Sequence, residues 1–165
     1  MMLKRILFLI FFCCIAFSCE KEYYTTIPNY EVLLELKLAT LDFELNTNLA
    51  YKTITQPEAG RPGLSKFGYG GVLVINGFGE SLVNLYAFDL ACPEEAQRNI
   101  RVVPDNMSSS SSAVATATTA TCPKCGAVFN IAYGTGAPQS GSKYYLRSYK
   151  VSGNGMLNST YTVHN

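Results

Sequence analysis

Short segments in which apolar and polar residues alternate limit this chain to a β-rich fold. From Val32 to Leu38, and again from Leu41 to Leu45, every second residue is apolar. Successive side chains of a strand point to opposite faces of a sheet, so this period of two predicts two half-buried strands. The polar stretch of residues 46–67 is rich in Thr, Pro and Gly, which favours a loop.

An Asn-Gly dipeptide at residues 76–77 separates the apolar segments 72–75 and 82–90. Both residues tolerate positive φ, so the pattern is typical of a hairpin between two strands. Further strands are expected over residues 113–121, 143–151 and 160–163, and the five serines of residues 108–112 favour an exposed loop. No segment has the pattern of an amphipathic helix longer than a couple of turns. We therefore predict an all-β fold, a single antiparallel domain of about eight to ten short strands.

The first 19 residues have the pattern of an export signal. Lys4 and Arg5 precede an apolar run from Ile6 to Phe17, which is too short to span a bilayer, since a spanning helix needs roughly 20 apolar residues. The run ends in Ala16-Phe17-Ser18-Cys19, which resembles the lipobox of bacterial lipoproteins. That resemblance implies cleavage after Ser18 and attachment of lipid, such as palmitate, to Cys19. The alternative is an ordinary secretory signal that ends near a chance cysteine.

These features divide the chain into a signal peptide (1–18), a lipidated tether (19–29) and one domain (30–165), which matches the usual length of a single domain. The charged triplet of residues 20–22 fits either a surface-export tag or a plain polar linker. We expect a protein of the bacterial cell envelope, anchored in the outer membrane and facing the periplasm or the cell surface. Its expected partner is the membrane itself, which it contacts through the lipid.

Charge excludes one class of partner. Without Lys4 and Arg5, the chain from Cys19 carries 11 basic and 12 acidic residues, a net charge of −1. A nucleic-acid-binding domain normally has a clear basic excess, so no nucleic-acid partner is expected.

Three cysteines remain once the leader and the lipid attachment site are set aside: Cys92, Cys122 and Cys125. An odd number leaves one thiol free in any disulfide framework. Cys122 and Cys125 lie in a Cys-Pro-x-Cys-Gly turn, in which two thiolates three residues apart can reach one metal ion.

The sequence around these cysteines resembles the two cluster-binding loops of the Rieske family. Residues 86–94, which end in Cys92-Pro93-Glu94, are similar to the first loop, and residues 122–129 are similar to the second. Residues 134–141 resemble the loop that covers the cluster, and the resemblance extends over about residues 70–163. It implies a Rieske-like β domain that holds a 2Fe-2S cluster and passes electrons to an envelope redox partner.

The chain departs from the Rieske pattern at the ligands. In that family each loop supplies one cysteine and one histidine. Here the cysteine positions match Cys92 and Cys122, whereas the histidine positions match Glu94 and Cys125, and the only histidine, His164, matches neither loop. Anionic ligands in place of imidazoles favour the oxidised state, so any cluster should have a lower potential.

Several interpretations of the cysteines therefore stay open. The resemblance implies a metal site made by Cys92, Cys122, Cys125 and Glu94, which would hold either a 2Fe-2S cluster or zinc. For zinc, Glu94 or Asp89 would complete a closed, structural tetrahedron. Alternatively, Cys92 could form a disulfide with one cysteine of the second loop, or the site could be empty on a Rieske-like scaffold. In either case this would be a cluster-free envelope protein used for binding or structure. No catalysis is expected, because no histidine in the domain can serve as the base for a serine or cysteine nucleophile.

Overall fold

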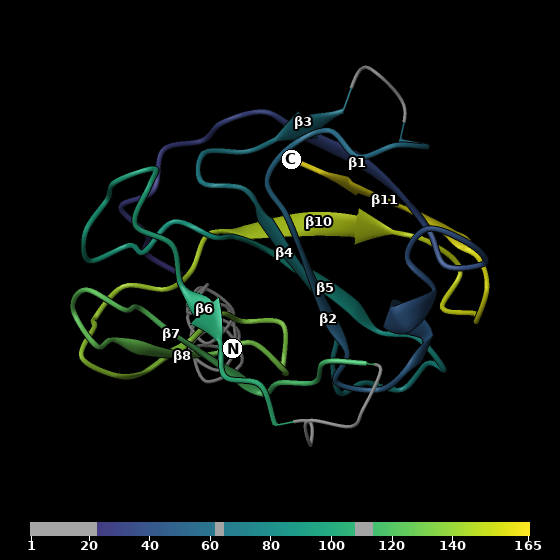
Figure 1. Cartoon of the computed structure of the whole chain (residues 1–165). Coiled ribbons are helices and arrows are strands. Elements are labelled where there is room, and N and C mark those ends of the chain that lie inside the picture. The colour runs from purple at the N-terminus through teal and green to yellow at the C-terminus, as the bar shows by residue number, and fades with distance from the viewer. Residues whose placement is uncertain (1–22, 62–64, 108–113) are drawn as a thin grey trace, which may run out of the picture.

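The computed structural model describes residues 23–61, 65–107 and 114–165 (Figure 1). The larger of its two sheets has seven strands, in the spatial order β2 (Tyr51–Ile54), β4 (Val72–Asn76), β5 (Leu85–Asp89), β10 (Ser148–Ser152), β11 (Thr160–His164), β1 (Val32–Lys37) and β3 (Lys66–Phe67). The smaller sheet consists of β6 (Val103–Pro104), β7 (Thr119–Thr121), β8 (Val128–Asn130) and β9 (Pro138–Ser140). Every strand pair is antiparallel. The all-β prediction is confirmed, with eleven strands in this part of the chain against the eight to ten expected.

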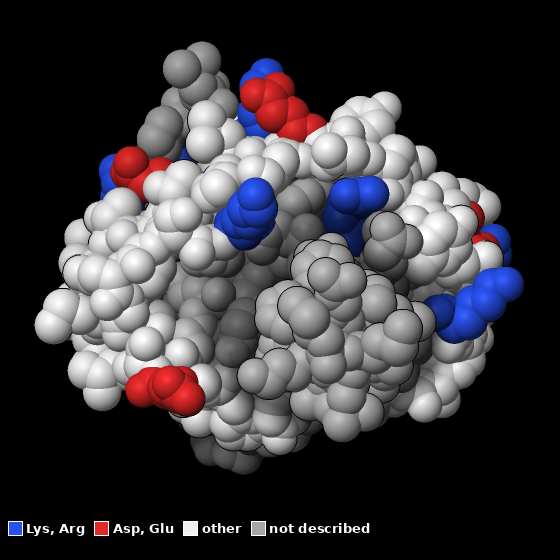
Figure 2. All heavy atoms as spheres, turned by 180° about the vertical axis from the view of Figure 1, so that it is seen from behind, with Lys and Arg blue, Asp and Glu red and all other residues white. Residues whose placement is uncertain are grey.

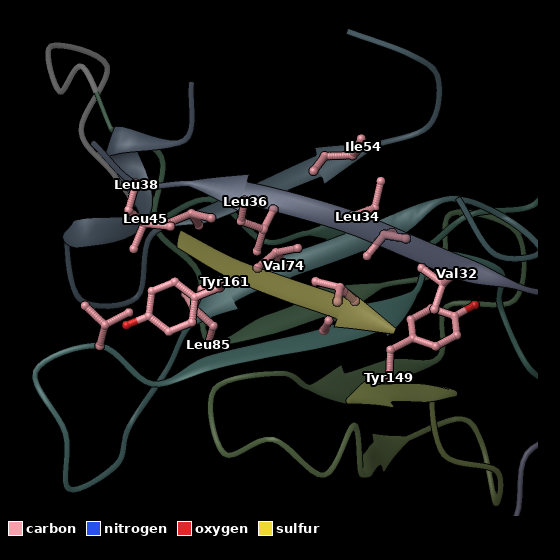
Figure 3. Packing of buried hydrophobic residues seen from close by; sticks show 14 residues of the cluster. Val32, Leu34, Leu36, Leu38, Leu45, Ile54, Val74, Leu85, Tyr149 and Tyr161 are labelled. Carbon is pink, nitrogen blue, oxygen red and sulfur yellow. The ribbon is translucent and has the colours of Figure 1, made fainter. Parts of the chain in front are cut away.

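The strand predicted from the alternation of apolar and polar residues after Val32 is present as β1. Val32, Leu34 and Leu36 are buried, while the residues between them are exposed or half-buried. Together with residues of β4, β10 and β11 they form one apolar cluster, in which Tyr149 and Tyr161 also pack (Figure 3).

β4 is buried along its whole length because both of its faces are covered. Val72 and Val74 belong to the cluster of Figure 3, whereas Leu73 and Ile75 pack into a second apolar cluster together with Phe129 of the small sheet. This explains why residues 72–75 form a continuous apolar run, since a strand covered on both faces has no need of polar positions. The second cluster also contains Cys92 and Cys122, so these two cysteines lie among the side chains that pack between the two sheets.

The strand predicted over residues 41–45 is wrong. The chain turns sharply after β1 and forms a short 3₁₀ helix, η1 (Phe43–Asn46). The cause is Asp42, which is fully buried, accepts a hydrogen bond from the backbone N of Lys37 (2.8 Å) and pairs with the Arg61 guanidinium (2.5 Å). The Lys52 ammonium lies 3.0 Å from the same carboxylate. A buried carboxylate requires such partners, and these partners fix the turn.

The loop predicted over residues 46–67 is also wrong in part, because it contains β2 and β3. β2 pairs with β4 over the full length of β2, although its sequence has little strand pattern of its own, so a neighbouring apolar strand determines its conformation. The expected pairing of β4 with β5 around Asn76-Gly77 is confirmed. The connection between the two strands is a longer loop, however, which a hydrogen bond from Gly77 N to Asn84 O (2.9 Å) closes.

Figure 2 shows the face opposite to the view of Figure 1. Most of the described residues on this face are neither acidic nor basic, and the Lys and Arg side chains among them lie mostly apart from one another. The distribution agrees with the nearly balanced charge of the chain. The predicted loop of residues 108–112 lies outside the described residues.

Asp89, at the end of β5, ties three segments together. Its fully buried carboxylate accepts hydrogen bonds from the backbone N atoms of Tyr69 (2.7 Å), Gly70 (2.9 Å) and Ala91 (2.8 Å), and from the Tyr149 hydroxyl (2.6 Å). Gly68 lies so close to this centre that a Cβ there would stand 2.2 Å from the Tyr149 oxygen. Asp89 thereby fixes the end of β5 three residues before Cys92.

Replacing Tyr149 with phenylalanine tests this centre. The hydroxyl donates to a charged acceptor, and hydrogen bonds of that kind contribute about 1.5–3 kcal/mol, so Tyr149→Phe should lower the free energy of unfolding in urea by about that amount. Burial and the adjacent Asp89 raise the pKa of Tyr149 above its ordinary value. The contribution should therefore be constant below pH about 10 and decline as the pH rises towards the higher folded-state pKa. An unchanged free energy of unfolding at pH 7 would show that the Tyr149 hydroxyl does not contribute to stability.

Candidate metal centre

Cys92 begins the loop that connects β5 to β6. Its backbone N donates to Ile100 O (2.9 Å) and its carbonyl accepts from Ala96 N (2.9 Å), while Ala91 forms a bridge with Arg101. These bonds close the loop on itself and hold its first residue in place. The Cys92 side chain is fully buried.

The second loop connects β7 to β8. Cys122 N donates to Ala127 O (2.8 Å) and Gly126 N donates to Cys122 O (2.9 Å), so residues 122–127 form a closed turn. Gly126 has a φ of +73°, and the space around its Cα is open, so glycine is required by backbone conformation and not by crowding. The turn buries Cys122 fully and leaves Cys125 exposed.

The two loops bring the three thiols together. The Sγ atoms of Cys92, Cys122 and Cys125 all lie within 4.8 Å of one another, and those of Cys92 and Cys125 are 3.6 Å apart. All three are free thiols in this structure. Among the described residues they form a group that could hold a metal ion, as the Cys-Pro-x-Cys-Gly turn predicts.

Backbone N–H groups lie near the two buried sulfurs, and the pKa values of the two thiols shift in opposite directions. Burial raises the pKa of Cys92 to about 12, although the N–H groups of Glu94 and Glu95 oppose the rise. For Cys122, burial acts in the same direction, but the N–H groups of Cys125 and Lys124, together with hydrogen bonds from the Cys92 and Cys125 thiols, lower the pKa below its ordinary value. Cys122 is thus the buried thiol more ready to be a thiolate, the form that binds metals.

An ion pair links the two loops across the site. The Lys124 ammonium lies 2.5 Å from a carboxylate oxygen of Glu95, and this contact raises the pKa of Lys124. Lys124 stands between the two cysteines of its turn and adds positive charge beside the thiols. The sequence gives no signal for either residue, because neither Lys124 nor Glu95 is part of a recognised spacing of metal ligands.

The carboxylates predicted as ligands are not members of the three-thiol group. Glu94 is outside the three-thiol group, and its Oε1 accepts a hydrogen bond from the backbone N of Lys143 (3.1 Å). Asp89 is occupied by the four donors described above. His164 lies on β11, where its ring bonds to the Ser152 hydroxyl (3.0 Å).

Comparison of the chain with protein-family models, curated proteins and solved structures finds no match. Within the described residues, no helix is long and apolar enough to cross a membrane. Cys19 and the leader lie outside those residues.

Proposed function

We propose that this chain is a lipid-anchored envelope protein that holds one thiophilic metal ion between two Rieske-like loops. The convergence of the Cys92, Cys122 and Cys125 sulfurs carries the proposal. The backbone N–H groups that face the buried Cys122 sulfur support it, because such donors stabilise the thiolate form that a metal requires.

The sulfur positions favour a single ion over a two-iron cluster. Zinc–sulfur bonds of about 2.3 Å place two thiolates of a tetrahedron about 3.8 Å apart. Cys92 and Cys125 are 3.6 Å apart, which fits two ligands of the same ion. A 2Fe-2S cluster divides its ligands between two irons, and the Rieske form needs two histidines on one of them. The donor set here contains no histidine, so it does not fit that cluster.

The experiment is metal analysis of the full-length protein, extracted in detergent and purified without oxygen. We expect about one zinc or similar ion per chain and no acid-labile sulfide. Equal amounts of iron and sulfide would overturn the single-ion proposal and make electron transfer the function. A protein that takes up no metal even after incubation with zinc would refute the metal site itself.

The N-terminal segment connects the metal site to the predicted anchor. Tyr145 N donates to Tyr24 O (2.9 Å), the Thr26 hydroxyl donates to Pro93 O, and Ile27 is buried. The segment is therefore attached to the domain from Tyr24 onward. Thr26 lies seven positions after Cys19, a stretch that spans at most about 25 Å when extended. Lipid on Cys19 would hold the loop of Cys92 close to the membrane surface.

Replacing Cys19 with alanine tests the anchor. The acyl chains contribute about 0.8 kcal/mol of membrane affinity per buried methylene, so Cys19→Ala should move the protein from the membrane pellet to the soluble fraction. Cys92→Ala, which changes a cysteine of the domain instead, is the matched control and should stay in the pellet. Sedimentation of both variants with the membranes would contradict the lipid anchor.

A further inference from the structure

A cavity of about 540 Å³ is lined by residues of β3, of the segment 68–71 that follows it, and of the loop between β5 and β6. Ligand pockets usually measure about 300–1,000 Å³, so this cavity has room for a small organic molecule. None of the three cysteines lines the cavity, so it is distinct from the candidate metal centre.

The charged side chains that line the cavity are mostly basic. They are three cations and one carboxylate, with a net charge of +2: Lys66, Arg98, Arg101 and Glu31. Among the described residues, none of the three cations forms an ion pair with a carboxylate. Residues 62–64, which precede the cavity and lie outside the described residues, are Pro, Gly and Leu and add no charge. Because the whole chain is nearly neutral, this local excess of positive charge favours an anionic ligand.

Two of the cations are held in place by the protein itself. The Arg98 guanidinium lies over the rings of Tyr30 and Tyr69, with its Cζ atom 4.9 and 5.2 Å from the two ring centroids. Arg101 Nε donates to Gly70 O (2.5 Å). A guanidinium has five N–H donors, and these contacts use only part of them. Both arginines can therefore still bind an oxyanion through paired hydrogen bonds.

The backbone of residues 68–71 forms a fixed wall of the cavity. The N–H groups of Tyr69 and Gly70 donate to the buried Asp89 carboxylate, so they are not free to bind an anion. Recognition of an anion therefore depends on the cationic side chains. Because a ligand need not order this wall, less of its binding free energy is lost on association.

We propose that the cavity binds a phosphate monoester carried by a hydroxylated molecule, such as a sugar phosphate. Arginine suits phosphate because its planar fork matches two of the phosphate oxygens. A phosphate monoester carries a charge of about −1.5 to −2 at pH 7, which balances the net charge of the cavity. A carboxylate or a sulfate ester carries a single negative charge and would leave the cavity positive.

The rest of the lining suits the organic part of such a ligand. Glu31, Thr55 and Ser65 contribute a carboxylate and two hydroxyl groups to the lining, and Phe67 contributes an aromatic ring. A carboxylate accepts hydrogen bonds from hydroxyl groups. A sugar has hydroxyl groups around its edge and an apolar face, so it matches this mixture of polar and apolar residues.

The test is isothermal titration calorimetry with the full-length protein in a non-ionic detergent. We expect glucose 6-phosphate to bind one-to-one, at least about ten-fold more tightly than inorganic phosphate or glucose 6-sulfate, because each of these loses contacts or charge. Glucose should not bind. Equal affinity for inorganic phosphate would overturn the organic ligand, and equal affinity for glucose 6-sulfate would overturn the match of charge.

Variants show whether the ligand occupies this cavity. Arg98→Gln and Arg101→Gln each remove a charged donor, so each should weaken binding of glucose 6-phosphate at least about ten-fold. Lys143→Gln is the matched control, because Lys143 also lies over a tyrosine ring, at 5.1 Å from the Tyr144 centroid, but does not line the cavity. It should bind like the unchanged protein. Equal affinity in all three variants would place the ligand elsewhere and overturn the proposal.

Two further titrations identify what fills the cavity. Dibutyryl phosphatidic acid is a water-soluble lipid with a phosphate monoester, and tighter binding of it than of glucose 6-phosphate would identify a lipid headgroup and overturn the sugar. Glu20 and Glu22 lie outside the described residues and are the acidic residues of the predicted tether. If glucose 6-phosphate binds only after both are changed to glutamine, the tether occupies the cavity, and an external ligand is refuted. Absence of binding in every protein would refute it as well.

Discussion

Replacing Cys122 with alanine is expected to abolish metal binding. Cys122 is the fully buried member of the three-thiol group with the lowered pKa, and without it two sulfurs alone would remain, on separate loops. Loss of groups that merely support a ligand typically weakens a metal site 10–100-fold, so loss of the ligand itself should cost more than about 100-fold in affinity. Metal content after dialysis against a weak chelator measures the effect.

Lys124→Ala is the matched control for this variant. It changes the same turn and removes the ion pair with Glu95, but it touches no sulfur. The Lys124→Ala protein should retain its ion through the dialysis that empties Cys122→Ala. Equal metal content in the two variants would exclude the site defined by the three thiols.

Replacing Asp89 with alanine should produce the largest loss of stability of the variants considered. The substitution leaves three backbone N–H groups and the Tyr149 hydroxyl without an acceptor in a buried place. Each such donor costs about 1–3 kcal/mol, and because removing the buried charge offsets part of the sum, we expect a loss of about 3–5 kcal/mol in the free energy of unfolding. Urea denaturation followed by circular dichroism measures it.

Asp105→Ala provides the comparison. The Asp105 carboxylate also accepts two hydrogen bonds, from Thr119 and Thr121 at 2.8 Å each, but it is exposed, so water can replace it. Its loss should change the unfolding free energy by no more than about 0.5 kcal/mol. Similar effects for Asp89→Ala and Asp105→Ala would show that the buried carboxylate does not hold β5 to its neighbours.

The sequence predicts the strands whose pattern reflects their own burial. β1 alternates because one of its faces is in the core, and β4 is uniformly apolar because both of its faces are. The prediction fails where distant residues decide the conformation. Asp42 ends β1 through Arg61, which lies 19 residues away, and β2 exists because β4 offers it a free edge. Neither partner can be found by scanning a short window.

The same distinction applies to the candidate metal centre. The spacing of Cys122 and Cys125 indicates a metal-binding turn, and the resemblance of two loops adds Cys92, so the sulfur group follows from the sequence. Its fourth ligand does not. Glu94 and Asp89 stand close to Cys92 in the sequence, but their hydrogen bonds to Lys143 and Tyr149 depend on segments about 50 and 60 residues further along the chain.

The burial of Cys92 and Cys122 among apolar side chains would affect how fast the protein could gain or lose a metal ion. In small zinc domains metal binding supplies the folding free energy, so loading is as slow as folding. Here Leu73, Phe88 and Phe129 belong to the same buried cluster as Cys92 and Cys122, and they lie in sheets that have their own hydrogen bonds. Loading would then require only that the protons of the three thiols leave and that an ion enter beside Cys125. Exchange would be a local event at the rate of ligand substitution, so the protein could report metal supply without unfolding.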